Sequence, residues 1–297
     1  MLPRPLLILA AILVLASGSC SRRTPAAAED ASVPRRIISL APNTTEILFA
    51  LGVGDRIVGV SSADDYPSQV SELPKVGIIN SPEFETIVSL RPDLIVATGI
   101  QPAAKEELIR KAGLRLVIVP QETLADVYTA IRTLGNAVGH ADHATRLIAS
   151  LRARERAVVA RTERIPVAER PKIFVMLGQQ PVYTAGPGSF VADLVHAAGG
   201  RLVTASLDKP FTTVTGEFVI EADPDVILVG HEHPEDAAEV VAEISSRLGW
   251  ANVAAVRQGR IIADMDPDIL WRPGPRLIDG LEQLAARLHP ELFKGAP

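Results

Sequence analysis

Cysteine is almost absent from this chain: Cys20 is the only one among 297 residues, so no internal disulfide can form. An excess of positive charge is missing as well, because the formal net charge is -5 and the pI is near 5.7. No run of lysine and arginine is interleaved with aromatic residues, a pattern that would indicate a nucleic-acid-binding surface. We therefore expect no nucleic acid among the partners.

Three sequence motifs of α/β enzymes are also missing. The chain has no Gly-x-Ser-x-Gly nucleophile motif, no Walker phosphate-binding loop and no Gly-x-Gly-x-x-Gly that opens a helix after a strand. These absences favour a protein that is not an enzyme and has no cofactor of its own. The alternative is a metal-dependent hydrolase that uses His231, Glu232, His233 and Asp236.

The first twenty residues have the pattern of an export signal, with Arg4 before an apolar stretch and small residues before Cys20. The apolar stretch is too short to span a membrane comfortably. The position of Cys20 resembles a lipoprotein acylation site, although Ser17 replaces the usual leucine. We predict a lipoprotein signal over 1–20 and a flexible tether over 21–34. Lipid on Cys20 would then hold an exported protein on the periplasmic or outer side of a membrane. An ordinary signal peptide with an incidental cysteine is the alternative.

The rest of the chain has the pattern of an α/β fold. Short apolar runs alternate with helical segments, which is typical of mostly parallel sheets flanked by helices. The expected strands are 37–40, 57–60, 94–97, 116–119, 173–177, 226–229 and 260–263. The interval 142–164 contains no strong helix breaker, so we predict one helix of about 30 Å there.

The second half of the chain partly repeats the first. Glu85–Val96 aligns without gaps with Glu217–Leu228, since each segment begins with glutamate and has a Pro-Asp pair before an apolar strand. A similar match links 43–52 with 189–199, and Asn43 is expected to cap the first of these helices in a capping box with Glu46. The predicted parts are an N-terminal α/β lobe, a long linking helix and a C-terminal α/β lobe, over 35–140, 141–166 and 167–297.

Several motifs in a fixed order carry a family resemblance. They are Arg36-Ile-Ile-Ser-Leu-Ala-Pro-Asn-Thr-Thr-Glu46, Val58-Gly-Val-Ser-Ser62, Asp65-Tyr-Pro67, Pro74-Lys-Val-Gly77, 85–96 and Pro273-Gly-Pro-Arg276. The chain resembles, from about 36 to 290, the helical-backbone periplasmic binding proteins that serve importers of cobalamin, ferric siderophores and haem, and the cobalamin binders most. The resemblance implies two lobes joined by one long helix, a ligand in the cleft between them, and an ABC permease dimer with ATPase subunits as partner.

In open parallel sheets, ligands bind beyond the carboxyl ends of the strands. On that rule and the resemblance, the candidate ligand-binding residues are Pro42, Asn43, Tyr66, Tyr183, Gly186, Phe211, Asp268, Trp271 and Arg272. The aromatic rings can pack on a large macrocycle, and Asp268 with Arg272 suits a flat ring edged with amides. Each residue also has a structural alternative, such as a turn or cap for Pro42 and Asn43, or core packing for Phe211.

The ligand stays open at this point. The segment 77–82 lacks a tryptophan that some cobalamin binders carry there, which leaves a ferric siderophore, or haem with Tyr66 as axial ligand, beside cobalamin. His231 and His233 follow a strand and can in principle ligate a metal ion, but loop histidines are usually only solvated.

Glu85 and Glu217 occupy equivalent positions in the two halves, each at the start of a predicted helix. The resemblance assigns one such glutamate per lobe to docking on arginines of the permease dimer. The structural alternative is stabilisation of each helix by a carboxylate in its first turn.

Overall fold

The computed structural model describes residues 33–78, 80–99, 103–230 and 234–293. The chain divides into two compact units, Met1–Ser32 and Val33–Pro297, and only the second contains described residues. Cys20, His231, Glu232 and His233 lie outside them. Among the described residues, no helix combines the length and the apolar character that crossing a bilayer requires.

The first lobe is a parallel sheet in the order β2-β1-β5-β6. Its strands are β1 Ile37–Ser39, β2 Ile57–Val60, β5 Leu94–Thr98 and β6 Leu116–Val119. The helices around it are α1 Pro42–Ala50, α2 Phe84–Ser89, α3 Ala103–Lys111 and α4 Leu124–Ala137. Side chains alternate across a strand, so Ile37 packs in the core beneath α1 and α4, whereas Ile38 packs with Ile87 of α2 and Ile109 of α3. Both faces of the sheet are therefore covered.

The second lobe repeats this arrangement in the order β10-β7-β12-β13, again parallel. Its strands are β7 Lys172–Met176, β10 Arg201–Leu202, β12 Val226–Val229 and β13 Ile261–Ile262. One face packs on α6 and α11 and the other on α7, α8 and α9; these helices are α6 Phe190–Ala197, α7 Gly216–Ala222, α8 Ala237–Ser246, α9 Ala254–Arg257 and α11 Leu277–Leu288. The predicted class, two α/β lobes with parallel sheets, is confirmed.

Smaller elements decorate the two sheets. A short hairpin, β3 Gly77–Ile78 with β4 Ser81–Pro82, precedes α2. In the second lobe, β8 Gly178–Gln179, β9 Val182–Ala185 and β11 Phe211–Val214 form an antiparallel sheet, and α10 Pro267–Trp271 precedes α11. The alternation of apolar runs did not predict these elements, because each is only two to five residues long.

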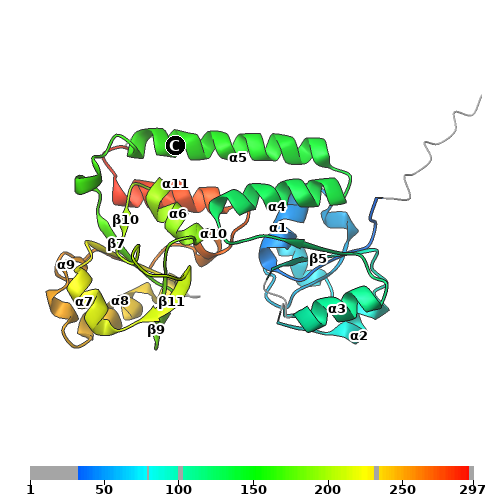
Figure 1. The fold of residues 1–297 in the computed structure, drawn as a ribbon, viewed down its shortest axis with the longest axis horizontal. Helices are drawn as coiled ribbons and strands as arrows, with labels where there is room; N and C mark the ends of the chain where they lie inside the picture. The colour runs from blue at the N-terminus through cyan, green and yellow to red at the C-terminus, as the bar shows by residue number, and fades with distance from the viewer. Residues whose placement is uncertain (1–32, 79, 100–102, 231–233, 294–297) are drawn as a thin grey trace, which may run out of the picture. The chain divides into compact units, whose positions relative to one another are not determined.

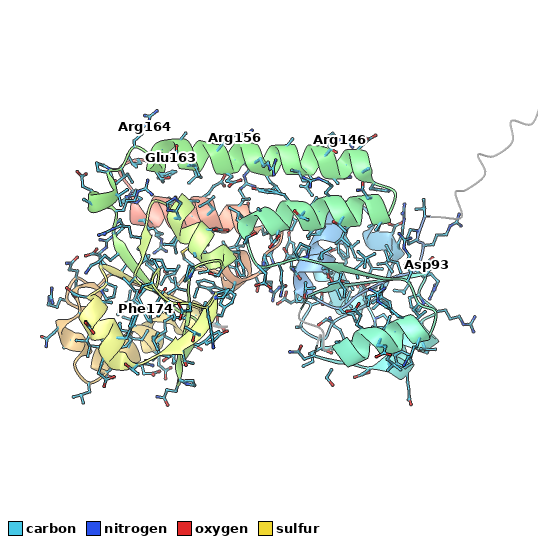
Figure 2. The ribbon with its side chains drawn as sticks, in the orientation of Figure 1. Asp93, Arg146, Arg156, Glu163, Arg164 and Phe174 are labelled. Atoms are coloured by element: carbon cyan, nitrogen blue, oxygen red, sulfur yellow. The ribbon has the colours of Figure 1, made fainter. Side chains whose placement is uncertain are left out.

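One long helix, α5 Ala141–Thr162, runs beside α4 and α11 (Figure 1). It is held to α11 by Arg154, whose Nη2 lies 2.5 Å from Asp279 Oδ1 and 2.6 Å from Glu282 Oε2. Figure 2 shows Arg146 and Arg156 on its outer face. Its inner face joins a core that contains buried side chains of both sheets. The two lobes therefore share one continuous core beneath α5.

The sequence repeat is visible in the backbone. Arg91 and Asp223, which align in the repeat, both have left-handed conformations with φ of 47° and 42°. Two residues later, Asp93 accepts a hydrogen bond from the Arg36 amide at 2.9 Å, and Asp225 accepts one from the Lys172 amide at 2.7 Å. Each carboxylate thus fixes the start of the first strand of its own sheet.

The predicted capping box of α1 is wrong. Ala41 is the N-cap residue, Pro42 begins the helix, and no side chain caps it. Asn43 lies inside the first turn, and Glu46 points instead toward Arg276. The equivalent helix α6 does have a side-chain cap, because Ser189 Oγ accepts a hydrogen bond from the Ala192 amide at 3.1 Å.

Candidate ligand-binding site

A cleft of about 550 Å³ opens between the two lobes. Much of its wall comes from segments that follow parallel strands, as expected for open α/β sheets. The first lobe contributes Ala41, Pro42, Asn43, Thr98, Gln121 and Glu122. The second lobe contributes Leu177, Tyr183, Phe190, Val191, Phe211, Trp271, Arg272 and Pro273.

Aromatic rings form much of the second lobe's side of the cleft. Tyr183 and Phe211 lie on adjacent antiparallel strands, and their rings stack with centroids 6.4 Å apart. Phe190 packs against Phe211 at 6.1 Å. Trp271 lies over Gly230, where an added Cβ would be 2.9 Å from the indole nitrogen. Only glycine at position 230 leaves room for the indole in this position. The result is an apolar, partly flat wall.

Three buried polar atoms of the cleft residues have no hydrogen-bond partner among the described residues. They are Asn43 Nδ2, Thr98 Oγ1 and Trp271 Nε1. Leaving a buried donor or acceptor unpaired costs about 1–3 kcal/mol, so natural proteins rarely tolerate several such groups together without a partner. Two donors and one hydroxyl of the cleft residues thus lack a partner among the described residues, and a ligand would reach these buried atoms only if the wall moved.

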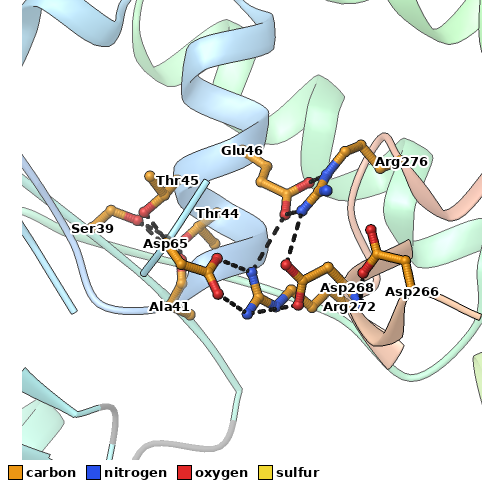
Figure 3. A network of polar contacts seen from close by, with 10 residues as sticks. All are labelled: Ser39, Ala41, Thr44, Thr45, Glu46, Asp65, Asp266, Asp268, Arg272 and Arg276. Atoms are coloured by element: carbon orange, nitrogen blue, oxygen red, sulfur yellow. Dashed lines mark hydrogen bonds and ion pairs between the residues drawn. The ribbon is translucent and has the colours of Figure 1, made fainter. Parts of the chain in front are cut away.

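A network of ion pairs joins the lobes at one side of the cleft (Figure 3). Arg276 Nη2 lies 2.7 Å from Glu46 Oε1, and Arg276 Nε donates to Glu46 Oε2 at 3.0 Å. Arg272 pairs with both carboxylate oxygens of Asp65, at 2.8 Å for Nη2–Oδ2, and with Asp268 at 2.8 Å. Because Arg272 and Arg276 belong to the second lobe and Glu46 and Asp65 to the first, both pairs cross between the lobes.

The carboxylates of this network differ in their electrostatic setting. Burial raises the pKa of Glu46, whose side chain is only 3% exposed, although Arg276 opposes this effect. Burial also raises the pKa of Asp268, with Arg272 opposing. The hydrogen bond from Arg272 lowers the pKa of the more exposed Asp65. Its neighbour Asp64 is buried, and burial raises its pKa to about 6 although Thr45 and Lys75 oppose this effect.

The structure brings six of the nine predicted ligand residues together at the cleft: Pro42, Asn43, Tyr183, Phe211, Trp271 and Arg272. Three lie elsewhere. Tyr66 packs beneath the guanidinium of Arg276, 3.7 Å from its ring centroid. Asp268 pairs with the two arginines. Gly186 contacts the chain before β11, because its amide donates to Pro210 O at 2.8 Å and a Cβ would lie 2.3 Å from Lys209 O.

Sequence reasoning missed several cleft residues. Thr98 ends β5, Gln121 and Glu122 follow β6, and Leu177 follows β7. The rule that ligands bind beyond the carboxyl ends of parallel strands, applied to every predicted strand, would have found these four. The sequence indicates Glu46 only as a capping residue and Arg276 only as part of a family motif.

The two predicted docking glutamates lie outside the cleft. Glu85 and Glu217 are exposed in the first turns of α2 and α7. Hydrogen bonds from its backbone amide and from Thr215 lower the pKa of Glu217. Three residues further on, the matching side chains Val88 and Ile220 are 46% and 37% exposed. In Figure 1, α2 and α7 lie on the side of the unit Val33–Pro297 away from α5.

Two similar α/β lobes, a shared core beneath one long helix and an apolar cleft between the lobes define a two-lobed solute-binding protein. The chain belongs to the periplasmic binding protein family, whose model matches residues 37–268. The resemblance found in the sequence is thereby confirmed.

Three relatives illustrate the range of this family. The chain is 32% identical to the uncharacterized ABC transporter substrate-binding lipoprotein YvrC of Bacillus subtilis, over 88% of this chain and 82% of that protein. The apo periplasmic heme-binding protein RhuT of Roseiflexus sp. RS-1 is 31% identical with a TM-score of 0.77, over 87% of this chain and 99% of that one. The periplasmic vitamin B12 binding protein BtuF of Vibrio cholerae is 27% identical with a TM-score of 0.74, over 88% and 98%. These relatives are binding proteins rather than enzymes.

Proposed function

We propose that this protein is the substrate-binding component of an ABC importer and that it captures a corrinoid, cobalamin or a close analogue, in the cleft between its lobes. The observation that carries the proposal is the cleft itself: aromatic rings of Tyr183, Phe211 and Trp271 stand beside unpaired buried polar atoms of Asn43 and Thr98. A bulky flat ring whose edge carries amides complements both features. The relatives named for vitamin B12 binding support this assignment.

A calorimetric titration of the purified protein tests the proposal. Cyanocobalamin, haemin and a ferric siderophore are added in separate experiments under one set of conditions. We expect saturable binding of cyanocobalamin at one molecule per chain and weaker or no binding of the other two. Absence of cyanocobalamin binding would overturn the corrinoid assignment.

Haem is the second candidate, because a relative of 31% identity is named as heme-binding. Tyr66 is half-exposed beneath Arg276 in this structure and does not line the described cleft. A haem protein would purify red, with a strong Soret band that changes in a Tyr66→Phe variant. A colourless protein that gains no such band on adding haemin would contradict this candidate.

We also propose that Glu85 and Glu217 dock the loaded protein on a permease dimer that ATPase subunits drive. Each glutamate is exposed near an exposed apolar side chain, Val88 or Ile220, at matching places in the two lobes. Exposed charges contribute little stability but set the register and rate of association. Two matching surfaces suit a partner with two-fold symmetry.

The proposed location is the outer side of a membrane, with a lipid on Cys20 as anchor. The name of the Bacillus relative, a lipoprotein, supports this location. Metabolic labelling with a radioactive fatty acid tests it: the wild-type chain should take up label, and a Cys20→Ala variant should not. Equal labelling of both chains would contradict the assignment of Cys20.

A further inference from the structure

The charge of the cleft limits which ligands can enter it, and Arg272 is the residue to consider first. Among the described residues that line the cleft, Arg272 is the only one with a positive charge. Its guanidinium already binds both oxygens of Asp65 and one oxygen of Asp268. An anionic ligand would therefore have to displace a carboxylate of the protein to reach this cation.

The nearby cation Arg276 is occupied in the same way. Two of its nitrogens hydrogen-bond the two oxygens of Glu46, Asp268 lies at 3.6 Å, and its flat face lies on the ring of Tyr66. Such paired hydrogen bonds between arginine and a carboxylate are among the strongest in proteins. Arg276 is thus not available to a ligand unless a buried ion pair breaks.

The charges on this side of the cleft do not balance. The two guanidinium groups face three carboxylates, those of Glu46, Asp65 and Asp268 (Figure 3). Glu122 lines the cleft and adds another negative charge. Because a buried or partly buried charge needs a partner of opposite sign, an anion entering this cleft would lose its hydration without gaining a free cation.

A neutral ligand meets no such difficulty. The wall offers aromatic and aliphatic surface together with the unpaired Asn43 Nδ2, Thr98 Oγ1 and Trp271 Nε1. We infer, on the basis of the proposed function, that the cleft selects macrocycles whose periphery is uncharged and rejects those that carry carboxylates. Asp65 and Asp268 are the residues that set this selectivity, because they hold Arg272.

Two pairs of ligands that differ mainly in the presence of a carboxylate at the ring edge test the inference. The first pair is cyanocobalamin and the monocarboxylic acid made by hydrolysing one of its propionamides. The second pair is haemin dimethyl ester and haemin. By calorimetry, we expect the neutral member of a pair to bind at least about tenfold more tightly than the acid, since an unpaired partly buried charge is costly.

Variants of the chain show which residues cause the preference for the neutral ligand. Asp65→Asn with Asp268→Asn removes the two nearest carboxylates from Arg272 and leaves Glu46 at 3.9 Å. The preference for the neutral ligand should then fall to about twofold or reverse. The matched control is Asp264→Asn, which removes a carboxylate 2.6 Å from Arg287, and neither residue lines the described cleft. This control should keep the full preference. The single variant Asp65→Asn, whose aspartate is mostly exposed, serves if the double variant does not fold.

The outcomes separate the inference from the proposed function. If cyanocobalamin does not bind but the haemin ester binds better than haemin, the corrinoid assignment is wrong and the charge inference stands. If an acid binds wild-type protein as tightly as its neutral partner, the charge inference is wrong, whichever macrocycle is bound. If no macrocycle binds, both are wrong.

Discussion

Asp64 carries a carboxyl group whose charged form is destabilised by burial. It is buried, and burial raises its pKa from 3.8 to about 6 although Thr45 and Lys75 favour the charged form. A carboxyl group whose pKa is higher in the folded state is protonated more readily there than in the unfolded chain. Below its unfolded pKa it therefore costs nothing, and the cost grows as pH rises toward the folded value.

An Asp64→Asn variant should for this reason be more stable than wild type at neutral pH. We expect a gain in the free energy of unfolding of roughly 3 kcal/mol above pH ~6, declining as pH falls and lost near pH ~4, from a pKa difference of about two units. Urea denaturation followed by circular dichroism from pH 4 to 8 measures it. A difference in stability between the two proteins that does not depend on pH would contradict the conclusion that the charged form of Asp64 destabilises the fold.

Trp271 gives a prediction for ligand binding. Its indole forms part of the cleft wall and packs on Gly230, so Trp271→Ala removes a large apolar contact. We expect Kd for the ligand to rise about tenfold to a hundredfold, because burying an aromatic side chain contributes about 1.5–3 kcal/mol. The control is Leu248→Ala, since Leu248 is 98% exposed and outside the cleft. Equal Kd values for both variants would show that Trp271 does not contribute to ligand binding.

Sequence reasoning performs unevenly at the scale of single residues. Pro42, Asn43 and Trp271 were predicted as cleft residues because position after a strand and family motifs both point to them. The structure places all three at the cleft, Pro42 and Asn43 on the first lobe and Trp271 on the second. Glu46 was misread as a capping residue. Its partner Arg276 is 230 positions away, and no local pattern can indicate a contact at that separation.

Between elements, the pair of Glu46 on α1 and Arg276 before α11 is an ion pair between the lobes with a buried carboxylate. Glu46 is 3% exposed, so Arg276→Ala would leave a buried carboxylate without a partner. We expect this change to lower the free energy of unfolding by about 3 kcal/mol, as for other buried pairs that lose one member. Chemical denaturation measures the loss.

The control for this change is Arg287→Ala. Arg287 pairs with Asp264 at 2.6 Å, but both side chains are half-exposed, and exposed pairs contribute about 0–1 kcal/mol. Similar decreases in the free energy of unfolding for Arg276→Ala and Arg287→Ala would show that burial of Glu46 does not increase the contribution of its ion pair to stability.

Element prediction succeeds where hydrophobic patterns are long. The buried strands β5 and β12 and the helix α5 lie close to their predicted positions, because continuous apolar runs and a stretch without breakers identify them. The sheet β8–β9–β11 was missed. Its strands are two to four residues long, and β11 is joined to β9 by a connection of 25 residues, so neither periodicity nor a hairpin turn indicates the pairing.

At the scale of the whole unit Val33–Pro297, the shared core beneath α5 and the ion pairs between the lobes limit how far the cleft can open. A domain interface that is large and apolar disfavours relative motion. We therefore expect a ligand to meet a largely preformed cleft and to change the outer surfaces of the lobes little. The proposed docking would then use surfaces that exist before the ligand binds.

The double variant Glu85→Ala with Glu217→Ala tests this separation of capture from delivery. Both carboxylates are exposed and outside the cleft, so Kd for the ligand should stay within about twofold of wild type, whereas uptake by cells should fall about tenfold or more as docking weakens. The control is Asp142→Ala with Glu163→Ala, which removes equal charge from exposed positions at the two ends of α5, on the side of this unit away from α2 and α7 (Figures 1 and 2). Weakened ligand binding in the first variant, or equal uptake by both, would contradict docking through these two glutamates. Normal uptake by the control with slow uptake by the first variant would assign delivery to the α2 and α7 surfaces.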